Sequence, residues 1–122
     1  MMTRAAALAL LAAAAAPLAA QGDPSDEALL ERRLRACLSS GAAGAPRDSL
    51  LSAVVAVRSL CHTQIGRVLD FRLAAVDKSF GLPGARLSAS RQIELDRARD
   101  AAARQLNDEV ALAVSNFTGL TP

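Results

Sequence analysis

The chain has 122 residues, of which 52% are apolar and only 2% aromatic, with no Trp, no Tyr, two Cys and one His. That length corresponds to one small domain. So few aromatic side chains leave little to stack on nucleic-acid bases, and one His with two Cys is a poor ligand set for a first-row metal. We therefore expect no nucleic-acid binding, no metal site and no cofactor.

Residues 1–20 have the layout of a secretory signal peptide. Arg4 precedes an uninterrupted apolar run over residues 5–16, and small residues follow. A run of about 12 residues is too short for the roughly 20 that a membrane-spanning helix needs. Cleavage after Ala20 or after Gly22 fits the small-residue pattern equally well. We expect export to the periplasm or the cell exterior.

The remaining chain is close to neutral. Without Arg4 it carries 13 basic and 12 acidic residues, so no net field favours a phosphate backbone. All basic residues but Lys78 are arginines, and alanine is abundant. This usage indicates a GC-rich bacterial genome, which makes the bacterial envelope the expected destination.

The first predicted helix covers residues 24–40 of a single helical domain, residues 23–118. Asp23 can cap this helix, Pro24 suits its first turn, and Gly41 is a natural stop. Residues 41–47, rich in Gly, Ala and Pro, then form a linker.

The second predicted helix covers residues 48–80, where apolar side chains recur every three or four positions. Either Asp48 or Ser49 can cap its start. Gly81, followed by an apolar residue and a proline, predicts a Schellman-type stop. Gly66 is the weak point, because an interior glycine costs about 1 kcal/mol relative to alanine. One helix bent at Gly66 and a break just before it both remain open.

The third predicted helix covers residues 88–117, with Leu95, Leu106 and Phe117 on its inner face and alternating charges outside. At 1.5 Å per residue the last two helices would be about 50 and 45 Å long. Helices of matched length joined by a short turn predict a long antiparallel hairpin, on which the shorter first helix packs. The expected fold class is all-α.

Two cysteines in an exported chain most simply form a disulfide bond with each other. A Cys37–Cys61 bond would close a loop of about 24 residues and contribute on the order of 3 kcal/mol. Cys61 would lie about 20 Å from the start of the second helix. We therefore expect an extended linker running back along that helix, with the first helix stapled near its middle. Pairing between two chains remains open. A homodimer also remains open, because a second subunit could cover the apolar face of the hairpin.

Arg72 falls within about 20° of Cys61 on the helical wheel, on the apolar stripe of the second predicted helix. A buried arginine needs a carboxylate. Folding the hairpin about residues 83–84 brings position 72 opposite 96, so Asp96 is the expected partner in a buried ion pair; an anion-binding Arg72 is the other interpretation. Arg99 also falls on the inner side, without an assignable partner.

Catalytic signatures are lacking. His62 follows Cys61, but adjacent residues in a helix point about 100° apart, so they do not form a nucleophile–base pair. We predict no catalytic residue and an exported helical protein of the bacterial envelope that works by contact with an unidentified envelope protein. A periplasmic stress chaperone and an inhibitor of a secreted enzyme are alternatives, and a small enzyme built around His62 is the least favoured. Contact with a membrane surface also remains open.

Overall fold

The computed structural model describes residues 24–122, so the expected signal peptide and both cleavage positions lie outside the described residues. This part of the chain contains four helices and no strand: α1 (Pro24–Ala43), α2 (Leu50–Leu60), α3 (His62–Ser79) and α4 (Ala89–Thr118). The all-α prediction is confirmed. Within these residues no helix is both long and apolar enough to cross a membrane.

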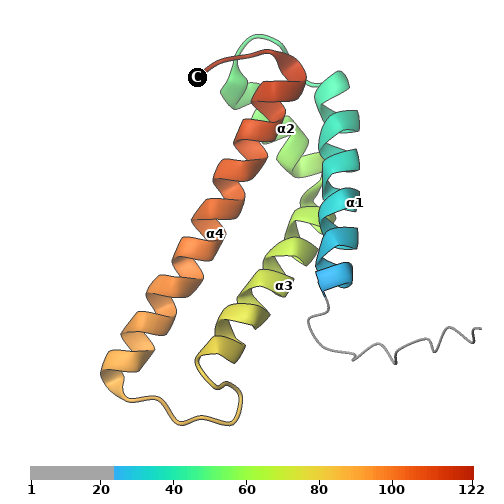
Figure 1. Cartoon of the computed structure of the whole chain (residues 1–122). Helices are drawn as coiled ribbons and strands as arrows, with labels where there is room; N and C mark the ends of the chain where they lie inside the picture. Colours follow the sequence, from blue (N-terminus) through green and yellow to red (C-terminus); the bar gives the residue numbers. More distant parts are fainter. Residues whose placement is uncertain (1–23) are drawn as a thin grey trace, which may run out of the picture.

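Each of the four helices packs against the other three. Figure 1 shows α3 running to the loop of residues 80–88 and α4 returning beside it. The shorter α1 lies along the half of this pair that is remote from the loop, and α2 crosses the same end of the molecule (Figure 1). The domain therefore has a four-helix end and a two-helix end.

Of the two possibilities left open for residues 48–80, the continuous helix is wrong and a break is present, but the break lies at Cys61 rather than just before Gly66. Cys61 adopts φ −100° and ψ 16°, ending α2 and starting α3. Buried positions before and after it recur at three consecutive four-residue steps, from Ala53 to Ile65. Each such step drifts by about 40° around a straight helix, so these positions would spread over about 120° of its surface. A change of direction at Cys61 keeps both segments against the core.

The expected extended linker is also wrong. α1 continues through Gly41 to Ala43, and the remaining connection to α2 is a compact turn crossing the C-terminal end of α4, where Arg47 donates a hydrogen bond of 2.9 Å to the Thr118 carbonyl. A Cβ on Gly41 would lie 3.4 Å from a methyl group of Val57. The glycine expected to stop α1 instead lies within it and faces α2 at an ordinary contact distance.

Helix ends follow local chemistry. Ser49 caps α2 by accepting a hydrogen bond from the Ser52 N–H at 3.0 Å, and Ser88 caps α4. Gly81 lies at φ +82° after α3, and the N–H groups of Gly81 and Leu82 bond the carbonyls of Lys78 and Asp77. This is the predicted Schellman-type stop.

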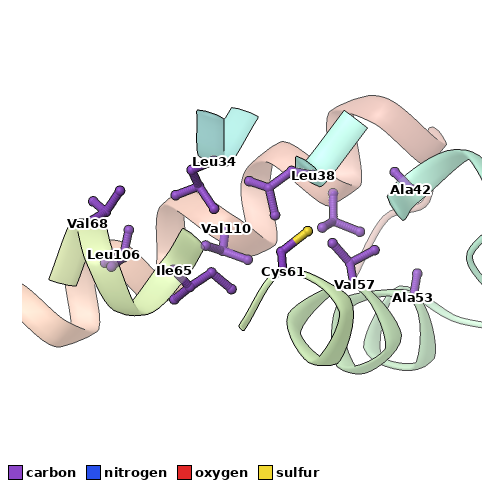
Figure 2. Packing of buried hydrophobic residues seen from close by; sticks show 11 residues of the cluster. Leu34, Leu38, Ala42, Ala53, Val57, Cys61, Ile65, Val68, Leu106 and Val110 are labelled. Atoms are coloured by element: carbon purple, nitrogen blue, oxygen red, sulfur yellow. The ribbon is translucent and has the colours of Figure 1, made fainter. Parts of the chain in front are cut away.

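All four helices contribute to one buried apolar cluster. Its members are Leu34, Leu38, Ala42, Ala53, Val57, Cys61, Ile65, Val68, Leu106, Val110 and Val114. Figure 2 shows Cys61 in the middle, with Val57 and Ala53 to one side and Ile65 and Val68 to the other. The Cys37–Cys61 disulfide is present within the chain, with the two Cα atoms 5.9 Å apart. The bond thus attaches α1 to the junction between α2 and α3.

Candidate functional site

A groove with a volume of about 540 Å³ lies between α1 and α4. Leu34 and Leu38 of α1 and Leu106 and Val110 of α4 form its apolar floor, and all four are buried. The three leucines and Val110 pack between the two helices. Alanines and charged side chains line much of the rest of the groove. A volume of this size is in the range that small ligands or anchoring side chains occupy.

One end of the groove carries an ion triad centred on Arg72. Its guanidinium donates hydrogen bonds to Glu109 of α4 at 2.6 Å and to Glu31 of α1 at 3.2 Å. The Arg72 side chain is 19% exposed, whereas both glutamates are about half exposed. One side chain from α3 therefore ties together the two helices that form the groove.

The triad determines how Arg72 titrates. Partial burial lowers the pKa of Arg72, but the hydrogen bonds to Glu109 and Glu31, with the attraction of their charges, outweigh it. The net effect is a pKa raised above the ordinary arginine value. Arg72 therefore stays charged throughout the pH range in which small domains are folded.

The predicted ion pair between Arg72 and Asp96 is wrong, because Arg72 pairs with Glu31 and Glu109 instead. Asp96 is exposed and accepts a hydrogen bond from Gln92, one turn earlier on α4. Asp77 of α3 pairs with Arg99 of α4 at 2.5 Å. Counting from this pair along the two helices as they run in Figure 1, position 72 lies opposite about 104. The connection over residues 80–88 offsets the helices, so folding the chain symmetrically about residues 83–84 gave the wrong partner.

Glu31 and Glu109 are the triad residues that sequence reasoning missed. Neither lies at a spacing that links it to Arg72, since they are 41 and 37 residues away along the chain. The only available signal was Arg72 itself, a charge on an apolar stripe, which correctly indicated that carboxylates approach it. The same argument applies to Arg99, whose partner Asp77 depends on the helix register.

The other end of the groove is apolar and exposed. Leu112 is 62% exposed and Phe117 is 39% exposed, which makes Phe117 the most exposed of the three phenylalanines. Arg32 and Arg35 of α1 line the same groove, and neither forms a salt bridge within residues 24–122. The groove therefore combines an apolar floor, an accessible aromatic ring and two unpaired positive charges.

The structure gives no support to a Cys–His nucleophile. Both cysteines are in the disulfide, and His62 is exposed at the first position of α3. In the described part of the chain, no three His, Cys, Asp or Glu side chains come together in a way that could hold a metal ion. What the site offers chemically is recognition by shape, apolar contact and charge.

Comparison with known proteins gives no family: no family model, no curated protein and no solved structure matches this chain.

Proposed function

We propose that this chain is an exported interaction protein of the bacterial envelope, whose α1–α4 groove receives an amphipathic helix of another protein. The observation that carries the proposal is the groove itself, with buried leucines and valines as its floor and with Leu112 and Phe117 exposed at one end. Exposed aromatic and large aliphatic side chains beside a concave apolar surface are the usual anchors of protein interfaces.

A helix suits the groove for two reasons. A channel between two packed helices accepts apolar side chains spaced at three and four residues on a third helix. Arg32 and Arg35 are themselves three residues apart on α1, so they place two positive charges along the groove. A partner helix with acidic residues beside its apolar stripe would satisfy both features.

Export is part of the proposal and has separate support. The signal-like pattern of residues 1–20 and the intramolecular disulfide both suit an oxidising compartment. N-terminal sequencing of the protein recovered from the periplasm or medium tests it. A start at residue 21 or 23 is expected, and an intact N-terminus on protein found only in the cytoplasm would contradict export.

Site-specific photocrosslinking tests the groove. A photoreactive amino acid replaces Leu112 in the groove or, as a matched control, Ile93, which lies on the same helix outside the groove and is 53% exposed. The Leu112 position should give a discrete crosslinked product in living cells, and the Ile93 position should not. Adding Arg35→Glu to the first variant should abolish the product.

The identity of the product distinguishes the alternatives. One envelope protein, crosslinked through an acidic amphipathic helix, supports the proposal. A product of two copies of this chain would indicate a homodimer, a secreted hydrolase would indicate an inhibitor, and many unrelated proteins at both positions would indicate a chaperone. Equal labelling at Leu112 and Ile93 would contradict a role for the groove.

A further inference from the structure

The connection over residues 80–88 projects from the two-helix end of the domain, away from α1 and α2 (Figure 1). In the described domain, the buried apolar cluster takes none of its members from this connection. Residues 83–86 are all exposed. Local opening costs least where few buried contacts are lost, so this segment can open while the four helices stay folded. Exposed loop tips of this kind are where proteases most readily cut folded proteins.

The backbone around the peptide bond between Arg86 and Leu87 is unpaired. Within residues 24–122, neither residue takes part in a backbone hydrogen bond through its N–H or its carbonyl group. The nearest bond before them joins the Ala85 N–H to the Gly81 carbonyl at 2.9 Å, and Ser88 after them is extended, with φ −66° and ψ 165°. A backbone without internal partners can pair as an added strand with the edge of a binding cleft.

The described domain has two arginines outside its helices, and they differ in what holds them. Arg47, in the connection between α1 and α2, donates a hydrogen bond of 2.9 Å to the Thr118 carbonyl. Its neighbour Asp48 accepts a hydrogen bond from Ser52, so that connection is attached to two helix ends. Arg86 is absent from the salt bridges and from the side-chain hydrogen bonds that arginines make within residues 24–122. Its guanidinium is therefore free to enter a complementary pocket.

The base of the loop is fixed, which confines any opening to the loop itself. Gly81, at φ +82°, ends α3, and the Phe80 ring beside it lies 4.3 Å from the guanidinium of Arg91. On the other side, Ser88 caps α4 by accepting a hydrogen bond from the Arg91 N–H at 3.3 Å. The exposed arginine is thus presented between two anchored helix ends rather than on a fraying helix.

We propose that the peptide bond between Arg86 and Leu87 is a cleavage site for a trypsin-like endopeptidase, whose acidic specificity pocket receives the Arg86 side chain. A planar guanidinium suits such a pocket because it can donate two parallel hydrogen bonds to one carboxylate. Hydrolysis breaks the bond between the Arg86 carbonyl carbon and the Leu87 nitrogen. Water supplies the hydroxyl of the new carboxyl group and a hydrogen of the new amine. Because no backbone hydrogen bond holds these two residues to the rest of the described domain, the new ends separate, as in a substrate rather than an inhibitor.

Cleavage here would divide the domain between α3 and α4. The Cys37–Cys61 disulfide lies within the N-terminal fragment and keeps α1 attached to the junction of α2 and α3. α4 would be held by noncovalent contacts alone, and its return would depend on concentration instead of on an intramolecular connection. The cut therefore removes one wall of the α1–α4 groove, although the cleavage itself does not depend on the function proposed for that groove.

Limited digestion of the oxidised, folded protein with trypsin, followed by mass spectrometry over time, tests the site. The first products should be a fragment ending at Arg86 and a fragment beginning at Leu87. Arg86→Gln should slow the loss of intact protein about tenfold or more, because other arginines require a helix or the Arg47 contact to open. The matched control is Arg47→Gln in the other connection, which should change that rate less than about twofold. Urea unfolding checks that both variants are folded.

The same variants test cleavage in the producing cells and their medium. An N-terminus at Leu87 that is lost in the Arg86→Gln variant and retained in the Arg47→Gln variant supports the proposal. First cuts spread over helical arginines, equal digestion rates for the two variants, or an intact chain as the sole form in cells and medium would overturn it. A stable complex of the intact chain with active trypsin would also overturn it, since that is the behaviour of an inhibitor. Fragments that stay together on dilution would refute the release of α4.

Discussion

Reduction of the disulfide should destabilise the domain by about 3.4 kcal/mol. The bond joins residues 24 positions apart, and the loop-closure entropy released to the unfolded chain on reduction is worth about that much at 25 °C. A domain of this size has a total stability of about 5–15 kcal/mol. The bond therefore accounts for a large share of the free energy of unfolding, because an aromatic-poor core of Leu, Val and Ala contributes little area per residue.

Urea denaturation of the same protein with and without a phosphine reductant measures this difference. The midpoint should fall by roughly 2 M, and the melting temperature by about 15–20 °C. Reduction leaves both sulfur atoms in place, so it isolates the crosslink. The Cys37→Ala/Cys61→Ala variant should lose about 1 kcal/mol more, since Cys61 is fully buried and loss of its sulfur leaves a void.

Three results would refute this reasoning. Oxidised and reduced protein could unfold with free energies within about 1 kcal/mol of each other, which would mean that the loop adds little entropy to the unfolded chain. Thiol titration of the unreduced, unfolded protein could find two free thiols, which would mean that the bond is absent. A disulfide-linked dimer on a non-reducing gel would place the bond between chains.

Three further substitutions test individual features. Arg72→Met should lower the free energy of unfolding by about 1–2 kcal/mol. This is less than the loss of a fully buried ion pair would cost, because water already screens the two half-exposed glutamates. A decrease above about 3 kcal/mol in urea unfolding would contradict this. Ser49→Ala should cost about 1 kcal/mol by leaving the Ser52 N–H without its cap, and unchanged urea unfolding would show that another group replaces the cap. Gly81→Ala should cost about 1–2 kcal/mol because its φ is +82°. Gly84→Ala, where the new methyl group would lie at an ordinary contact distance of 3.9 Å from the Gly81 carbonyl oxygen, should change the melting temperature little, and equal effects would remove the backbone argument.

Features that depend on neighbouring residues were predictable. The cap at Ser49, one of two candidates, and the stop at Gly81 follow from residues within three or four positions of the affected backbone groups. The ends of α4 fall within one residue of the expectation for the same reason. The cysteine pairing was predictable because two cysteines allow only one bond within a chain.

Features that depend on how distant segments meet were not predictable. The candidate groove requires Leu34 and Leu106 to face each other across α1 and α4, and no local pattern encodes that distance. The partners of Arg72 depend on the offset that the connection over residues 80–88 introduces between α3 and α4. Arg72 itself was found because its position on an apolar stripe is a local property.

The sequence by itself determined the all-helical class, the stop at Gly81 and the presence of a partly buried arginine, and it favoured the disulfide within one chain. Only the tertiary structure decided that α2 and α3 separate at Cys61, that α1 continues through Gly41, and that Glu31 and Glu109 meet Arg72. The physical reason is that hydrogen bonding and capping act over one turn of helix, whereas a bend or a helix register is set by packing between segments tens of residues apart.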